Sequence, residues 1–162
     1  MQGEIDPEPP TSLFPDVDAA ETRCWQQFFT SSSRLMTTLT NSLMDAHGLT
    51  LFDVLLLDLL AKSDSGGARM RDLADTFVLA PSRVTQQIRR LQNQGLVSRS
   101  PDPDDRRGVI ASITTQGRSR LGPAIKTYAQ GVRTHYINQM SRQQMIALGD
   151  SCHRVGMANS VE

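Results

Sequence analysis

The polar side chains between Pro81 and Gln94 form a set that is able to bind nucleic acid. Arginine, glutamine and hydroxyl side chains recur in this segment, which contains neither Asp nor Glu. Arg pairs with guanine, Gln pairs with adenine, and hydroxyls donate to phosphate oxygens. Arg and Gln are also good helix formers on any solvent-exposed face, so both interpretations are open at this point. The apolar positions 84, 88 and 91 predict one buried helix face, and the candidate contacts left outward are Ser82, Arg83, Thr85, Gln86, Arg89 and Arg90.

A turn-rich segment, residues 101–108, carries the next two arginines, Arg106 and Arg107. Short apolar runs on either side predict two strands, so these arginines lie at the tip of a hairpin. A cationic hairpin tip beside a DNA-binding helix can enter the flanking minor groove. Since acids repel phosphate, we expect Asp105 to pair with an arginine and fix its direction. The alternative is a solvated turn in which Asp and Pro only make the bend.

The charge of the chain is distributed unevenly. Its net charge is zero, with 17 basic and 17 acidic residues. Six of the acids fall within residues 1–21, which contain no base, so the remaining chain carries 17 bases against 11 acids. Residues 83–107 alone contain six arginines against three aspartates. A local basic face matters more for DNA binding than the whole-chain total, and this distribution favours a nucleic-acid partner.

The periodicity of apolar residues predicts the elements that position these side chains. Gly48 and Gly95 supply the left-handed position that ends a helix, and Thr50 with Asp53 forms a capping box. In chain order we expect helices at 17–46, 50–61, 70–77 and 81–94 with a loop at 63–67, strands at 96–99 and 109–113, a helix from 115 that Pro123 kinks or restarts, and a last helix after a capping box at Ser141. This order is a mainly α fold with a small β-hairpin wing, that is, a winged helix-turn-helix.

Several other classes of protein are not supported by the sequence. No apolar run reaches the length of a transmembrane helix, and the acidic, proline-rich N-terminus is unlike a signal peptide, so we expect a cytoplasmic protein. No dinucleotide-binding, phosphate-loop, zinc-protease or hydrolase motif occurs, so we expect neither an enzyme nor a cofactor. Cys24 and Cys152 lie far apart, and the three histidines show no metal-ligand spacing, so we expect free thiols and no metal.

Five segments together resemble the multiple-antibiotic-resistance regulator (MarR) family of transcription regulators. They are Leu73–Asp75, Pro81–Leu91, Gly95–Arg99, Asp102–Arg107 and Ile113–Arg118. The wing pattern Asp-Pro-x-Asp-x-Arg is the most specific of them, and in it Asp105 and Arg107 match the wing pair of the family. The resemblance extends over residues 20–156. Gln87 departs from it, because the family usually has an apolar residue there.

The resemblance implies a bacterial homodimer that binds a pseudo-palindromic duplex, with its two recognition helices in adjacent major grooves. Together with the composition, it divides the chain into a flexible acidic arm at 1–16, a helical dimerisation region at 17–48 and 115–156, a winged helix-turn-helix DNA-binding domain at 49–114, and a tail at 157–162. It also implies a repressor that a small aromatic or phenolic effector releases from DNA. The effector cleft would lie near Trp25, His47, Leu51 and Phe52, residues that fit an ordinary core or dimer interface as well.

Two alternatives stay open. Some relatives sense oxidants through a cysteine early in the first helix, and Cys24 lies in that region. Its helical register differs from theirs and no tyrosine accompanies it, so we expect Cys24 to be a buried structural thiol and Cys152 to lie in the core of the last helix. The other alternative is a winged-helix protein-interaction module without DNA binding. Such a module would have a neutral recognition helix, whereas this one is rich in arginine.

Overall fold

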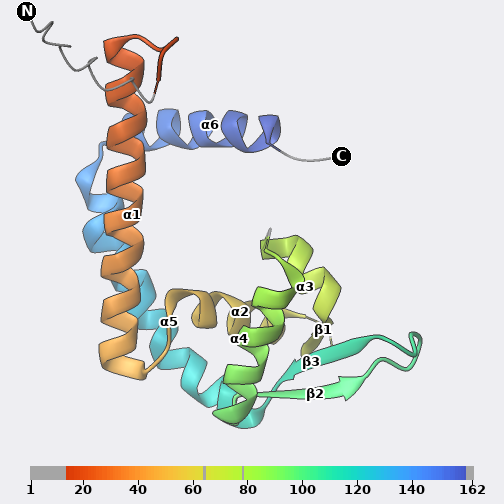
Figure 1. The fold of residues 1–162 in the computed structure, drawn as a ribbon. Helices are drawn as coiled ribbons and strands as arrows, with labels where there is room; N and C mark the ends of the chain where they lie inside the picture. The colour runs from red at the N-terminus through yellow and green to blue at the C-terminus, as the bar shows by residue number, and fades with distance from the viewer. Residues whose placement is uncertain (1–13, 64, 78, 160–162) are drawn as a thin grey trace, which may run out of the picture. The chain divides into compact units, whose positions relative to one another are not determined.

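The computed structural model describes residues 14–63, 65–77 and 79–159 (Figure 1). The predicted arm at 1–16 and the predicted tail at 157–162 fall partly outside these residues. The chain divides into two compact units, Met1–Leu35 and Met36–Glu162. The division falls within the first helix.

The first helix, α1 (Ala19–His47), begins two residues later than its apolar pattern predicts. Asp18 starts it, because the Asp18 carboxylate accepts from the backbone N–H groups of Ala20 and Glu21 at 2.6 and 2.9 Å. The Glu21 carboxylate accepts in turn from the N–H of Asp18 at 2.8 Å. This reciprocal arrangement satisfies N–H groups that have no partner inside the helix. Gly48, at φ +64°, ends the helix as predicted.

The three helices that follow are α2 (Leu51–Lys62), α3 (Met70–Phe77) and α4 (Pro81–Asn93), and α3 packs on α4. The predicted capping box of α2 is confirmed. The Thr50 hydroxyl accepts from the Asp53 N–H at 3.1 Å, and the Asp53 carboxylate accepts from the Thr50 N–H at 2.7 Å. No side chain caps α4 at Ala80, but its first residue, Pro81, has no N–H that needs a partner.

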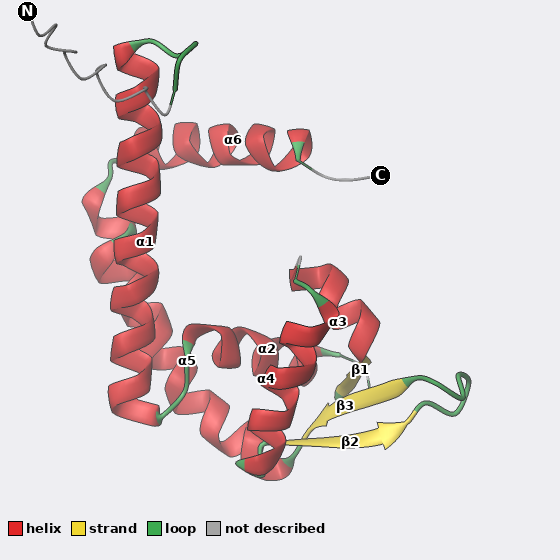
Figure 2. Ribbon diagram, viewed as in Figure 1, coloured by secondary structure: helices red, strands yellow, loops and turns green. Residues whose placement is uncertain are grey.

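Among the described residues, three strands form an antiparallel sheet in the order β1-β3-β2 (Figure 2). Strands β2 (Val97–Pro101) and β3 (Val109–Ile113) are the predicted hairpin, with Val97 opposite Ile113. Strand β1 (Gly67–Arg69) pairs with the other edge of β3. Strand β1 was not predicted, because three residues are too few to show an alternating pattern.

Helix α5 (Thr115–His135) continues through Pro123, so the restart that was one of the two predicted outcomes does not occur there. The Thr114 hydroxyl caps it by accepting from the Gly117 N–H at 3.0 Å, and donates to the Gly95 carbonyl at 2.7 Å. A 3₁₀ turn, η1 (Ile137–Gln139), separates α5 from α6 (Arg142–Ala158). The predicted capping box at the start of α6 is confirmed, since Ser141 and Gln144 each accept from the backbone N–H of the other.

The core of the second unit lies where α2 meets α5 and the sheet, and where α4 meets α3 and β2. Its largest fully buried side chains are mostly leucines, which pack without polar atoms to satisfy. They include Leu43, Leu49, Leu56, Leu57, Leu60, Leu73, Ile88, Leu91 and Leu96. Within the part of the chain that the structure describes, no helix has the length and apolarity needed to cross a membrane.

Candidate nucleic-acid interface

Helix α4 presents two different faces. Val84, Ile88 and Leu91 are fully buried, as their spacing predicts. On the other side, Ser82, Arg83, Gln86 and Arg89 are exposed, and Thr85 is half-buried with its hydroxyl donating to the Pro81 carbonyl at 2.9 Å. Within the described residues, no acidic side chain forms an ion pair with Arg83 or Arg89. The exposed face of α4 therefore offers hydrogen-bond donors and positive charge to a partner in solution.

Arg90 and Gln87 differ from the other polar residues of α4. Both are half-buried, and both donate to the carboxylate of Asp53 on α2. Arg90 was predicted to be an outward-facing DNA contact, whereas its guanidinium has a partner inside the protein. Gln87, a polar residue where the family usually has an apolar one, is explained by its contact with Asp53. No sequence signal joined Asp53 to α4, because the residues lie far apart along the chain.

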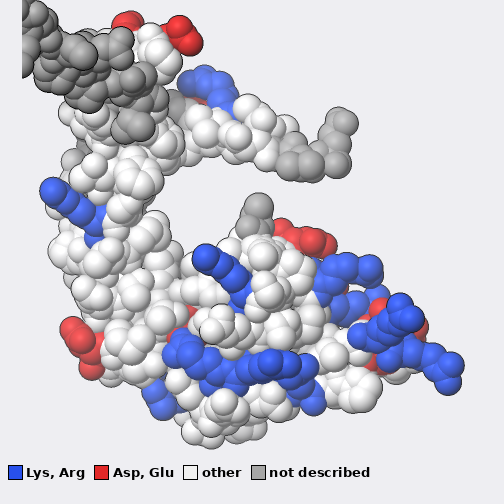
Figure 3. All heavy atoms as spheres, in the orientation of Figure 1, with Lys and Arg blue, Asp and Glu red and all other residues white. Residues whose placement is uncertain are grey.

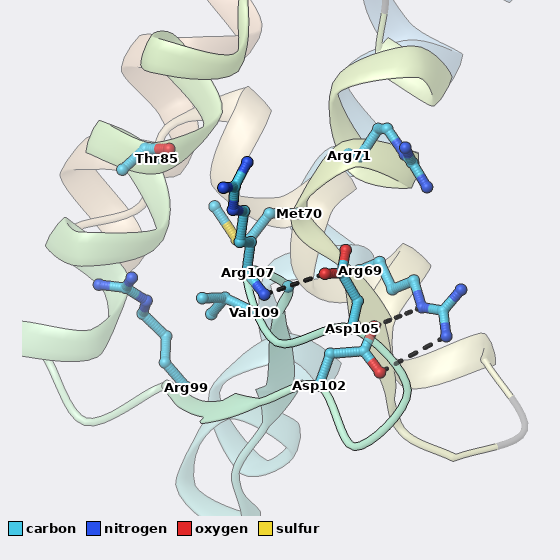
Figure 4. Close-up of a pocket in the computed structure, with 10 residues that line it drawn as sticks. Arg69, Met70, Arg71, Thr85, Arg99, Asp102, Asp105, Arg107 and Val109 are labelled. Carbon is cyan, nitrogen blue, oxygen red and sulfur yellow. Dashed lines mark hydrogen bonds and ion pairs between the residues drawn. The ribbon is translucent and has the colours of Figure 1, made fainter.

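A hollow of about 280 Å³ lies between α4 and the wing, the hairpin β2–β3 with its connecting turn (Figure 4). Thr85 of α4, Arg99 of β2 and Arg107 of the turn line it from three separate segments. Arg69 and Arg71 line its remaining side. The structure thus places the predicted recognition helix and the predicted wing arginine around one shared space on the same side of the second unit.

Arg99 was not among the predicted site residues. Its side chain is half-buried, and its Nε atom is buried without a hydrogen-bond partner in the protein. An unpaired buried donor on a cation is costly, and a ligand oxygen would satisfy it. Arg99 was counted in the basic charge of residues 83–107 and placed at the end of the first wing strand, but it was not named as a contact.

The acids of the wing have a structural role that differs in detail from the prediction. Asp102, whose side chain is buried, pairs with Arg69 of β1 at 2.6 Å, and Asp104 pairs with the same guanidinium at 3.2 Å. The carboxylate of Asp105 instead accepts from the backbone N–H of Arg107 at 2.9 Å. The expectation that Asp105 pairs with an arginine side chain is therefore wrong in this structure. Asp105 shapes the turn, and Asp102 and Asp104 fasten the wing to β1.

Asp102 is held in its ionised form. The backbone N–H of Asp104 donates to it at 3.0 Å and, with the Arg69 side chain, holds the pKa of Asp102 below its ordinary value of 3.8. Burial of the carboxyl opposes this shift without overcoming it. The anchor between the wing and β1 is consequently a charged one at neutral pH.

Arg106 and Arg107 are exposed at the wing turn, as predicted. Figure 3 shows basic side chains gathered over α4 and the wing, with acidic ones beside them at the wing. Within the described part of the chain, neither Arg106 nor Arg107 forms an ion pair. The turn is tightly packed at Gly108, because a Cβ there would lie 2.7 Å from the Cβ of Asp102.

The residues predicted to line an effector cleft do not share a common set of contacts. The His47 ring bonds to the Thr127 hydroxyl at 2.7 Å, and the Phe52 ring packs edge-on against Phe77 at 4.9 Å. Leu51 is buried at the start of α2. Trp25 belongs to the other unit, where its ring lies 6.1 and 6.0 Å from those of Phe28 and Phe29.

Both cysteines differ from the prediction. Cys24 and Cys152 are exposed free thiols in this chain, whereas a buried structural role was expected for Cys24 and a core position for Cys152. Both cysteines lie on helices, but among the described residues no other segment covers the face that either one occupies. Across the described residues, no three His, Cys, Asp or Glu side chains group in a way that could hold a metal ion.

Comparisons with known proteins agree with this geometry. The sequence pattern of the MarR family matches residues 49–109. The transcriptional regulator MhqR of Bacillus subtilis is 26% identical over 72% of this chain and 79% of its own. AbsC, a MarR family transcriptional regulator from Streptomyces coelicolor, superimposes with a TM-score of 0.82 at 26% identity, over 88% of this chain and 95% of AbsC.

Sco3205, another MarR family transcriptional regulator from Streptomyces coelicolor, was solved in complex with DNA. It superimposes with a TM-score of 0.86 at 25% identity, over 90% of this chain and 92% of its own. The match lies in the segment that holds α4 and the wing, and the structural likeness extends over nearly all of the chain. The chain is therefore similar to MarR family transcriptional regulators over most of its length, and its segment 49–109 matches the pattern of that family.

Proposed function

We propose that this regulator binds duplex DNA as a homodimer, with α4 in the major groove and the wing turn at the flanking minor groove. The observation that carries the proposal is the hollow that Thr85, Arg99 and Arg107 line together. A helix fits the major groove, which is about 12 Å wide, and a neighbouring hairpin then meets the adjacent backbone. The DNA complex of Sco3205 supports the same partner for this chain.

The residues have different roles in this proposal. Ser82, Arg83, Gln86 and Arg89 face the bases and phosphates of the major groove, because they are exposed on α4. Thr85 and Arg99 border the phosphates between the helix and the wing. Arg106 and Arg107 reach the minor groove, and Asp105 holds the turn that presents them. Arg90 is left out of the contact set because Asp53 already holds it.

The proposed homodimer is supported by the apolar side chains that remain exposed. The large ones among the described residues lie on α1, α5 and α6 or directly before α1, within or next to the predicted dimerisation region. They include Trp25, Phe28, Phe29, Ile125, Ile146 and Val155. Several exposed aromatic and aliphatic side chains on a few helices are typical of a surface that another chain covers. Two copies would present two recognition helices to a pseudo-palindromic site.

We further propose that the regulator is a repressor that a small aromatic or phenolic effector releases from DNA, in the cytoplasm and without enzymatic activity. A cavity of about 650 Å³ between α2 and α5 supports this part. Val54, Leu55, Ile125, Tyr128 and Val132 give it an apolar lining, which suits an aromatic ring. The effector proposal is tested by measuring the melting temperature of the protein, and its affinity for DNA, with a series of benzoates and phenols. If none of these compounds weakens DNA binding, the effector proposal is contradicted.

The experiment that tests DNA binding is selection of fragments from the source genome, followed by titration of the best fragment at several salt concentrations. Arginine contacts with phosphates release counterions, so the logarithm of the affinity should fall linearly and steeply with the logarithm of the salt concentration. The control is an unrelated duplex of equal length. Failure to enrich any fragment, together with a salt-independent affinity, would refute the proposed function.

A further inference from the structure

Asp53 is a fully buried carboxylate on α2, next to the proposed DNA-binding helix. A buried charge is costly unless donors surround it. Here one carboxylate oxygen, Oδ2, accepts from the Thr50 N–H at 2.7 Å and from the Thr50 hydroxyl at 2.8 Å, and also pairs with the Arg90 guanidinium. The other oxygen, Oδ1, accepts from the Gln87 amide. Both oxygens thus accept hydrogen bonds, two of them from Thr50 at the cap of α2 and two from side chains of α4.

The capping role of Asp53 does not explain the donors that come from α4. A capping box needs only the cap residue and the third residue of its own helix, and it works equally well at an exposed helix end. Gln87 and Arg90 lie three residues apart, so they project from neighbouring positions on one flank of α4. This flank lies between the buried stripe of Val84 and Ile88 and the exposed face of the helix.

Two contacts of this kind fix more than the distance between the helices. Apolar packing of Val84, Ile88 and Leu91 tolerates small rotations, because it has no directional atoms. A carboxylate that receives one donor from each of two successive turns of α4 admits one rotation of α4 about its axis and one position along it. The Asp53 side chain is buried while that of Arg90 stays 36% exposed, and an ion pair at a buried carboxylate is weak evidence for added stability, so we assign it a geometric role.

We propose that Asp53 is a positioning residue for DNA recognition, which acts through Arg90 and Gln87 to set the rotation of α4 in the major groove. This inference rests on the proposed function and deepens it. Arg90 then serves DNA binding from inside the protein, although it is a basic residue on the recognition helix. A helix rotated from its place would still offer positive charge to phosphates, but would misalign Gln86 and Arg89 with the base edges.

The test is a double-mutant cycle with Asp53→Asn and Arg90→Met, measured on the selected operator and on an unrelated duplex of equal length. Each single variant should lose affinity for the operator by about tenfold or more, while its affinity for the unrelated duplex and its salt slope stay close to those of the wild type. The double variant should be no weaker than the weaker single variant, because both changes remove one linkage. Arg83→Met is the matched control, and its loss should add to that of Asp53→Asn.

Three outcomes overturn the proposal. If Arg90→Met weakens binding to both duplexes alike and lowers the salt slope by about one, Arg90 is a phosphate contact. If Asp53→Asn keeps the ratio of operator affinity to unrelated affinity, α4 does not need this anchor. If the wild-type protein binds no duplex, the proposed function itself fails. That outcome is read from the wild type alone, so it is distinct from a failure of the positioning role, which is read from the variants. Should either variant fail to fold, Gln87→Leu removes one donor and keeps the ion pair; an unchanged affinity ratio for it would also overturn the proposal.

Discussion

Arginine residues that are similar in the sequence have different partners in the structure. Arg69 and Arg90 face buried carboxylates, Asp102 and Asp53, and hold separate elements together. Arg83 and Arg107 are exposed and carry positive charge that no acid of the described chain neutralises. The basic character of this surface therefore divides into side chains that build it and side chains that are available to a ligand.

This division predicts the effect of removing the wing arginine. Arg107→Ala should weaken operator binding by about tenfold or more, since a contact of this kind contributes about 1–3 kcal/mol. The melting temperature should stay within about one degree of the wild type, because the side chain is exposed. Gel-shift or anisotropy titration measures the first quantity, and calorimetry the second. Arg142→Ala, on α6, serves as the control and should leave affinity unchanged; equal affinities for the two variants would remove the wing from the interface.

Asp102 predicts how the wing responds to acid. Because its pKa is lowered in the folded chain, the carboxylate stabilises the folded wing at every pH above its ordinary value of 3.8. This stabilisation is lost as the pH falls below 3.8 through the lowered pKa. A carboxyl NMR titration should therefore show a midpoint below 3.8. In Arg69→Met the midpoint should rise only part of the way, since the Asp104 N–H remains; a wild-type midpoint at or above 3.8 would contradict the anchor.

At the scale of elements, the start of α5 is packed closely against the end of α4 and the start of β2. A Cβ on Gly117 would lie 2.2 Å from the Leu96 carbonyl oxygen, a backbone atom that can move only if the chain around it shifts. The Thr114 hydroxyl, which caps α5, also donates to the Gly95 carbonyl, so cap and glycine join the same two segments. This explains in physical terms why a glycine stands at position 117, within the segment Ile113–Arg118.

The close approach predicts a stability effect. Gly117→Ala should lower the free energy of unfolding by about 1–3 kcal/mol, as overpacking does in well-packed interiors. The matched control is Gly149→Ala in the middle of α6, where a Cβ would meet nothing within 4 Å. That change should raise stability by about 0.5–1 kcal/mol, because Ala favours the helix. Urea denaturation measures both, and a neutral Gly117→Ala would show that β2 shifts to make room.

The elements that carry local signals were predictable from the sequence. The capping boxes at Thr50 and Ser141 and the glycines after α1 and α4 act within a few residues, so their patterns could be read directly. Strand β1 could not be predicted, because it is defined by pairing with β3 more than 40 residues away. The continuation of α5 through Pro123 was not predicted either, because tertiary packing, which the local sequence does not reveal, supplies most of the stability of a helix in a protein.

The candidate site was predictable to a similar extent. The exposed side of α4 and the wing tip followed from residue types and spacing. The partners of the charged residues did not, since pairs such as Asp53 with Arg90 and Asp102 with Arg69 depend on how helices and strands meet. A sequence pattern predicts that an arginine lies near an interface. Whether that arginine forms an ion pair with an acid of the same chain depends on the fold.

At the scale of the whole molecule, the exposed apolar side chains of α1, α5 and α6 predict a second copy of the chain. Helix α6 has no buried residue within the described chain, and its apolar side chains Ile146 and Val155 are 54% and 62% exposed. Exposed side chains of this size destabilise a solitary chain in water unless another surface covers them. The wild-type protein should accordingly sediment at twice the chain mass of 17.9 kDa at micromolar concentration.

Ile146→Asp should shift this equilibrium toward the monomer, because the new carboxylate would have to be buried in the interface without a partner. It should also weaken operator binding steeply, since one recognition helix then binds without the effective concentration that its twin supplies. Thr76→Asp, an exposed change on α3, is the control and should remain dimeric. Analytical ultracentrifugation and operator titration on the same samples separate the two effects. A folded wild-type monomer at micromolar concentration would refute the dimer. If the Ile146→Asp variant remains dimeric, the interface lies on α1 and α5 and not on α6.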